Sequence, residues 1–155
     1  MEIKTAKIED SQAICSLLKE TFQEINSKDY PPRHIAAWVK FDSPEKIKEK
    51  IENKDFRNFL ALENNKIVGF LSLSPKKALV NSLYVKCSKI GQGIGSELLE
   101  FAEAIIKSQN KTEIKVHASK TASNFYKKKG YEKIKDMDLL VEGVKIPVIE
   151  MVKRI

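Results

Sequence analysis

Three glycines at alternate positions, Gly91, Gly93 and Gly95, constrain the fold of this 155-residue chain more than any other feature. They follow a strand-like run, Leu79 to Lys86, and lead into a helix whose apolar side chains recur at helical spacing. A second strand-like run, Glu113 to Ala118, comes after that helix. Strand, helix and strand in this order form a crossover, which places the two strands parallel in one sheet.

Five further segments have the composition or the alternation of strands. They are Glu2 to Ala6, Phe59 to Glu63, Ile67 to Ser74, Tyr131 to Val141 and Val144 to Val152. Asn64-Asn65-Lys66 and Glu142-Gly143 lie between neighbouring segments, and they suit hairpin turns because Asn and Gly tolerate a positive φ. Pro147 cannot donate a hydrogen bond to a neighbouring strand, so we expect an edge strand or a bulge there.

Four more segments have helical patterns. Asp10 is placed to cap the first, Pro31-Pro32 and Ser43-Pro44 to begin the next two, and Gly130 to end the last, from about Thr121 to Lys129. The chain contains no internal repeat, low-complexity segment or flexible linker. Residues 1–155 are therefore predicted to form a single domain with a mixed α/β sheet, in which the N-terminal helices can line a cleft.

The charge of the chain favours an anionic ligand. It has 28 Lys and Arg against 21 Asp and Glu, a net charge of +7 spread over the whole length. Basic clusters such as Lys127-Lys128-Lys129 lack the interleaved aromatic side chains of nucleic-acid grooves, which makes nucleic acid an unlikely partner. No apolar run approaches the roughly 18 residues that cross a bilayer, so we expect a cytoplasmic protein that makes no membrane contact.

The cysteines and histidines indicate neither a metal site nor a disulfide framework. Cys15 and Cys87 have no close-spaced partner, and His34 and His117 stand in no ligand spacing with them. We therefore expect no metal, and ordinary packing of the thiols in place of a nucleophilic cysteine with a histidine base.

The glycine turn itself predicts a phosphate site. Glycines let a ligand approach the backbone, and the unpaired amides at a helix start bind anions, with Ser96 adding a hydroxyl donor. A Walker loop needs Gly-Lys-Ser/Thr, which is missing here. A dinucleotide motif needs Gly-x-Gly-x-x-Gly and a carboxylate about 20 residues on, where this chain has Ile114 to Val116. A flexible turn without any ligand is the remaining alternative.

Three segments together resemble the GNAT superfamily of N-acetyltransferases. They are Leu83-Tyr84-Val85, Gly91-Gln92-Gly93-Ile94-Gly95-Ser96-Glu97-Leu98-Leu99 and Asn124-Phe125-Tyr126-Lys127-Lys128-Lys129-Gly130-Tyr131. The pairing of the glycine turn with the downstream Phe-Tyr-x-x-x-Gly-Tyr is the most specific part. The resemblance implies a GNAT-like mixed, mostly antiparallel sheet with a central parallel strand pair and flanking helices.

The resemblance also implies a binding site for acetyl-coenzyme A. The turn from Gly91 through Gln92, Gly93, Ile94 and Gly95 to Ser96 would bind the pyrophosphate, and the main chain of Leu83, Tyr84 and Val85 would pair with the pantetheine arm. Ile90 stands where the family has a polar residue, and Lys89 would supply the lost charge. Ser119 occupies the place of an asparagine that contacts the cofactor in many members.

Direct transfer to a primary amine needs a proton donor for the leaving thiolate and a way to keep the amine neutral. Tyr126 is predicted to be the acid, with packing beside Phe125 as its structural alternative. His117 is the predicted base; a structural histidine, a water relay to a distant carboxylate or a partly neutral amine are the alternatives.

Tyr30 and Trp38 are predicted to contact the acceptor, because N-terminal helices form that wall in the resembling family; core packing is equally open for Trp38. The acceptor would be a small-molecule or peptide amine. The competing function is a non-catalytic module that senses acyl-coenzyme A or binds nucleic acid. The C-terminal strands offer an edge for a homodimer.

Overall fold

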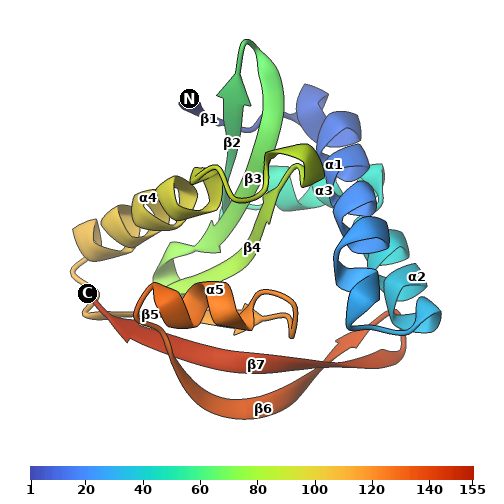
Figure 1. Cartoon of the computed structure of the whole chain (residues 1–155). Helices are drawn as coiled ribbons and strands as arrows, with labels where there is room; N and C mark the ends of the chain where they lie inside the picture. The colour runs from blue at the N-terminus through green and yellow to red at the C-terminus, as the bar shows by residue number, and fades with distance from the viewer.

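Seven strands form one sheet in the order β1-β2-β3-β4-β5-β7-β6 in the computed structural model, which describes residues 1–155 (Figure 1). The strands are β1 (Glu2–Thr5), β2 (Arg57–Glu63), β3 (Lys66–Ser74), β4 (Leu79–Val85), β5 (Glu113–Ala118), β6 (Glu132–Val141) and β7 (Val144–Arg154). All neighbours are antiparallel except β4 and β5. The predicted mixed, mostly antiparallel sheet with one parallel pair is confirmed.

Five α-helices cover the sheet. They are α1 (Ser11–Glu24), α2 (Pro32–Phe41), α3 (Pro44–Glu52), α4 (Ile94–Ser108) and α5 (Ser123–Lys128). Ser43 caps α3 by accepting a hydrogen bond from the Lys46 amide at 3.3 Å. Asp10 precedes α1 but does not cap it, because its carboxylate accepts from the backbone N–H of Lys7 at 2.8 Å instead. No helix combines the length and the apolar composition needed to cross a membrane.

The two faces of the sheet carry separate hydrophobic cores. Alternation along β2 illustrates this, because Phe59 and Ala61 belong to the core under α4 and α5, whereas Leu60 belongs to the core under α1, α2 and α3. Strands with both faces covered are buried on both sides, and β3 accordingly has seven consecutive buried residues from Val68 to Ser74.

The structure differs in two details from the predicted hairpins: the length of the turn between β2 and β3, and the position of β7 in the sheet. Asn64 and Asn65, with φ of 49° and 62°, make a two-residue turn, and Lys66 already belongs to β3. The strand of Pro147 is not an edge strand, because β7 lies between β5 and β6. β5 pairs with β7 only from Ile149 onward, so Pro147 has a neighbouring strand on one side only. Its missing N–H therefore breaks no two-sided ladder.

β4 and β5 separate soon after they meet. They pair only at Leu79 with Lys115 and at Val80 with Val116. An irregularity in the pairing of β3 with β4 leaves Asn81 without a partner, and such bulges bend a strand. Figure 1 shows β4 running away from β5, with α5 beside the opening. From this point to Val85 the side of β4 that faces the opening lacks a strand.

Candidate active site

A cavity of about 450 Å³ lies along the free side of β4. Four segments line it. They are the end of α1 with the next turn (Thr21, Ile25, Asn26), β4 (Leu83, Tyr84, Val85), the glycine turn and start of α4 (Lys89, Ile90, Gly91, Gly93, Ile94, Gly95, Ser96), and the segment from β5 to α5 (Ser119, Thr121, Ala122, Phe125, Tyr126). The structure thus brings together ten of the eleven residues predicted to bind the cofactor, and Tyr126 with them.

The glycine turn presents unpaired backbone amides to this cavity. Gly91 and Gly93 adopt φ of 83° and 88°, a conformation that a side chain disfavours. The first backbone hydrogen bond of α4 runs from the Glu97 amide to the Gly93 carbonyl at 3.0 Å. The three amides that begin α4, Ile94 to Ser96, therefore have no partner within the helix, and the positive end of the helix dipole lies there. The turn can bind an anion through its backbone.

The side chains around the turn contribute less than their sequence positions indicate. Lys89 lines the cavity, but its ammonium lies 2.9 Å from the carboxylate of Glu63. Gln92 does not line the cavity, because its side chain turns back to the Ser88 carbonyl, 3.5 Å away. Ile90 is 51% exposed at the mouth of the cavity. The site for an anion is therefore formed mainly by the main chain.

Free backbone groups extend from the turn along β4. Leu83, Tyr84 and Val85 pair with β3 on one side only, since β5 has already separated from β4. An extended ligand with amide groups can occupy the other side as an additional strand would. The cavity therefore joins an anion site to a strand edge that lacks a partner.

Tyr126 projects from α5 into the cavity. Only 4% of its surface is exposed, and its ring contacts Phe125 and Tyr131 edge to face, with centroids 5.1 and 5.4 Å away. Burial raises the pKa of its phenol above the ordinary value of 10.0. Tyr126 is therefore protonated at neutral pH and can donate its proton inside the cavity.

His117 lies outside the cavity lining. It alternates with the buried Val116 and Ala118, as the sequence predicts, and its Nε2 lies 3.8 Å from a carboxylate oxygen of Glu150 on β7. Burial lowers the pKa of His117, and Glu150 opposes that effect. The geometry does not bring His117 to Tyr126.

Tyr30 and Trp38 support the wall of the site and do not line it. The Tyr30 hydroxyl donates to the Pro147 carbonyl at 2.7 Å and accepts from the Lys120 amide at 2.9 Å. Trp38 is 8% exposed, and its ring stacks on Phe22 and meets the edge of Tyr30. Of the two alternatives for Trp38, the structure shows packing in the hydrophobic core.

Several lining residues escaped the sequence prediction. Thr21, Ile25 and Asn26 reach the cavity from α1 and the residues after it, and Thr121 reaches it from the segment before α5. Helical spacing identified the apolar stripe of α1, but polar positions beside that stripe give no signal of which cavity they face. The Oδ1 atom of Asn26 and the Oγ1 atom of Thr121 are buried without a hydrogen-bond partner.

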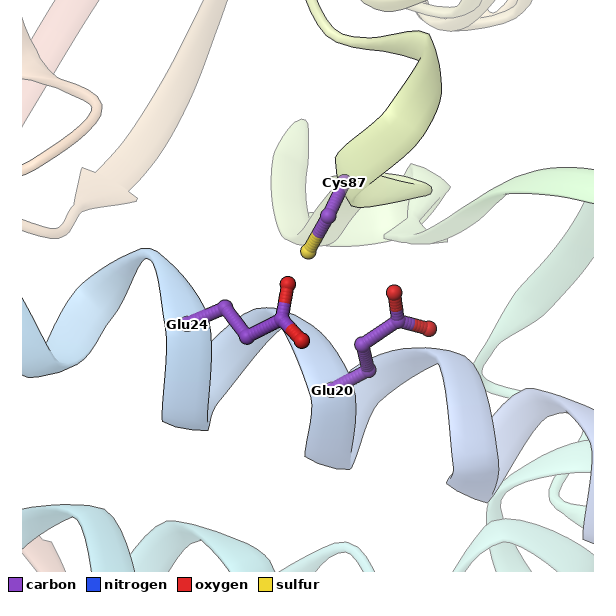
Figure 2. A group of neighbouring side chains, drawn as sticks. All are labelled: Glu20, Glu24 and Cys87. Atoms are coloured by element: carbon purple, nitrogen blue, oxygen red, sulfur yellow. The ribbon is translucent and has the colours of Figure 1, made fainter.

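One cluster of side chains of the types that bind metals lies near the cavity. It consists of Glu20, Glu24 and Cys87, whose possible ligand atoms all lie within 4.8 Å of one another. Figure 2 shows both carboxylates on α1, one turn apart, facing the thiol. Burial, reinforced by the charges of Glu20 and Glu24, raises the pKa of Cys87. This disfavours the free thiolate at Cys87.

The splayed parallel pair, the glycine turn at a helix start and the cavity between them define an acyltransferase fold of the GNAT type. The family model for the acetyltransferase (GNAT) domain matches residues 26–155. The chain belongs to this family and is an N-acetyltransferase of the GNAT superfamily.

Individual relatives agree with that assignment. The chain is similar to the spermidine N(1)-acetyltransferase of Thermoplasma acidophilum, with 28% identity over 148 residues that cover 89% of this chain and 91% of the relative. A GCN5-related N-acetyltransferase from Rhodopseudomonas palustris has a similar structure, with a TM-score of 0.91 at 21% identity over 99% of this chain and 95% of that one.

A second solved structure was determined with coenzyme A. It is the PaiA N-acetyltransferase of Thermoplasma acidophilum, which covers the whole of both chains with a TM-score of 0.78 and 24% identity. At this identity the likeness establishes a shared fold.

Proposed function

We propose that the protein transfers the acetyl group of acetyl-coenzyme A to a primary amine, directly, within a ternary complex. The observation that carries this proposal is the joining of unpaired helix-start amides to the free side of β4 in one cavity. Membership of the acetyltransferase family supports the reaction, and the coenzyme A complex of the PaiA structure supports the donor.

The cavity suggests how the donor would bind. The amides of Ile94 to Ser96 would hold the pyrophosphate, because they lack partners within α4 and lie at the positive end of its dipole. The free backbone groups of Leu83 to Val85 would pair with the amides of the pantetheine arm. Ser119 lines the same cavity beyond β5, where its hydroxyl already accepts from the Ala122 amide at 3.2 Å.

The proposed direct transfer uses only residues of the cavity and water. The amine nitrogen bonds to the thioester carbon, the carbon–sulfur bond breaks, and the nitrogen loses a proton to solvent. Tyr126 donates its phenolic proton to the departing thiolate and regains one from water. His117 is not needed in this scheme, because it lies outside the lining. The whole chain, residues 1–155, would act as one catalytic domain.

Release of the coenzyme A thiol in the presence of amines tests the proposal. The wild-type protein is mixed with acetyl-coenzyme A and a panel of amines that includes an amino-acid amide, a polyamine and a lysine peptide. We expect amine-dependent thiol release, with acetylated amine formed in equal amount by mass spectrometry. The proposal fails if thiol release stays at the amine-free rate for every amine tested.

A further inference from the structure

Lys89 is the only charged residue among those that line the cavity, which otherwise consist of apolar side chains, glycines and uncharged polar groups. Its ammonium lies 2.9 Å from a carboxylate oxygen of Glu63, and the two side chains are only partly exposed, at 36% and 30%. The one cation of the lining is therefore already paired. A ligand that carries phosphate groups would compete with Glu63 for it.

The backbone places Glu63 and Lys89 beside each other. Glu63 is the last residue of β2, and Lys89 ends the short 3-10 turn that follows β4. The Lys86 amide donates to the Val68 carbonyl of β3 at 2.8 Å, and the Lys89 amide donates to the Lys86 carbonyl at 2.8 Å. These hydrogen bonds hold the segment before the glycine turn against the hairpin of β2 and β3, so the ion pair has a fixed backbone on both sides.

Each member of the pair has another possible partner nearby. Lys89 stands two residues before Gly91, in the turn whose helix-start amides would hold a pyrophosphate. A lysine ammonium has three donors at the end of a flexible stem, so it can turn from a carboxylate to a phosphate without movement of the backbone. Glu63 is paired with Lys66 across the hairpin, and this places a second cation beside the carboxylate.

We propose that Glu63 weakens the binding of coenzyme A by holding Lys89, and that the pyrophosphate of the ligand displaces this carboxylate. Lys89 exchanges Glu63 for the pyrophosphate when the donor binds and returns to Glu63 when coenzyme A leaves. Glu63 does not line the cavity, so it is a positioning residue that acts on the ligand through Lys89. The inference rests on the proposed function for the identity of the donor, and it adds a residue of β2 that sets the affinity.

The exchange affects substrate and product alike. Acetyl-coenzyme A and coenzyme A carry the same phosphates, so Glu63 opposes the binding of the donor and favours the release of the product. The size of the effect follows from the ion pair that has to be broken. For a partly exposed pair this corresponds to a factor of about five in Kd.

Binding of coenzyme A to the whole protein, measured by calorimetry, tests the exchange without any transfer reaction. Glu63→Gln removes the charge of the carboxylate and keeps its size, and we expect its Kd to be about fivefold lower than that of the wild type. Glu63→Asp keeps the charge and should bind like the wild type, because the flexible stem of Lys89 can follow the shorter side chain. Loss of folding could only weaken binding, so a tighter complex cannot result from a destabilised variant.

A second variant tests whether Glu63 acts through Lys89. Lys89→Met should bind coenzyme A more weakly than the wild type, because the cation of the lining is gone. Adding Glu63→Gln to Lys89→Met should then change Kd by less than about twofold, since the carboxylate has no ammonium left to hold.

Ligand fragments and a charge control locate the effect at the pyrophosphate. Glu63→Gln should tighten the binding of 3′-dephospho-coenzyme A, which keeps the pyrophosphate, by the same factor, and leave the binding of pantetheine, which has no phosphate, unchanged. Asp136→Asn controls for the overall charge. It removes one negative charge from a 2.8 Å pair with Lys133 on β6, outside the cavity lining, and should leave Kd unchanged.

An unchanged or higher Kd in Glu63→Gln would overturn the inference, as would a gain of equal size in Asp136→Asn, in the binding of pantetheine or in the Lys89→Met background. A gain that disappears with 3′-dephospho-coenzyme A would assign Lys89 to the 3′-phosphate and contradict the exchange at the turn. If the wild type binds coenzyme A but acetylates no amine, the proposed transfer fails and the exchange still stands or falls on these Kd values. If it binds no coenzyme A, both fail.

Discussion

Several hydroxyl groups line the cavity, and Tyr126 is the one that the family motif identifies as a proton donor. Its burial keeps it protonated, and no base stands beside it in the lining. We predict that Tyr126→Phe lowers kcat by about 100-fold or more in the thiol-release assay while KM for acetyl-coenzyme A changes little.

Tyr131→Phe provides the matched control for this prediction. The Tyr131 hydroxyl donates to Glu103 at 3.1 Å and does not line the cavity, so its loss removes a phenol without touching the site. A Tyr126→Phe enzyme with full rate would show that the leaving thiolate receives its proton elsewhere.

Single residues were predictable where the backbone decides their role. Gly91 and Gly93, which we expected to let a ligand approach the backbone, adopt a positive φ and line the cavity, and Leu83 to Val85, which the resemblance placed beside the cofactor, line it too. Side-chain roles were harder to predict. The alternation of β5 predicts the face on which His117 lies, but not that Glu150 of β7 is its neighbour there. Trp38 packs in the core because helical spacing suits a core position as well as a binding wall.

At the scale of elements, the turn before α4 connects stability with ligand binding. Gly93, the N-cap of α4, has a φ of 88°, so Gly93→Ala should cost about 1 kcal/mol of folding free energy through backbone strain. The same strain displaces the amides that would hold the pyrophosphate. We therefore predict a KM for acetyl-coenzyme A that rises several-fold, measured together with the free energy of unfolding in urea.

Gly143→Ala separates the two effects. Gly143 has a comparable φ of 75° in the turn between β6 and β7, and a Cβ there would meet no atom within 4 Å. The variant should lose similar stability and keep the wild-type KM. If both variants raise KM equally, general destabilisation explains the Gly93 result and the anion site at the turn loses its support.

The order of elements followed from the sequence, but their lateral arrangement did not. Periodicity and turn residues predicted the existence and order of the strands and α-helices, since these depend on local spacing. The insertion of β7 between β5 and β6 and the bulge at Asn81 depend on tertiary pairing. The bulge lies directly after Val80, the last residue of β4 that pairs with β5, and the cavity begins beyond that point. The contribution of Asn26 to the site follows from the same packing.

For the whole molecule, the two histidines predict how stability depends on pH. Burial lowers the pKa of His34 and of His117 below the ordinary value of 6.5, and both ring nitrogens of His34 lack partners. The unfolded chain therefore binds protons that the folded chain does not. Stability should be complete above about pH 6.5 and fall at lower pH, by up to about 1.4 kcal/mol per pH unit for each histidine.

Urea unfolding of the wild type and His34→Leu at several pH values measures this dependence. As pH falls below 6.5, the free energy of unfolding should decrease less for the variant than for the wild type, because one of the two buried bases is gone. Identical slopes for the two proteins would mean that His34 is protonated in the fold without cost.

The central claim is that the cavity beside the glycine turn binds acetyl-coenzyme A, and thermal unfolding with added ligand tests it most directly. At a concentration 100 times Kd, binding stabilises a protein by about 2.7 kcal/mol, which for a domain of this size raises Tm by roughly 5 to 10 °C. We predict a shift of this size with acetyl-coenzyme A and none with NAD or ATP. An unchanged Tm at millimolar acetyl-coenzyme A, or an equal shift with all three ligands, would contradict the account.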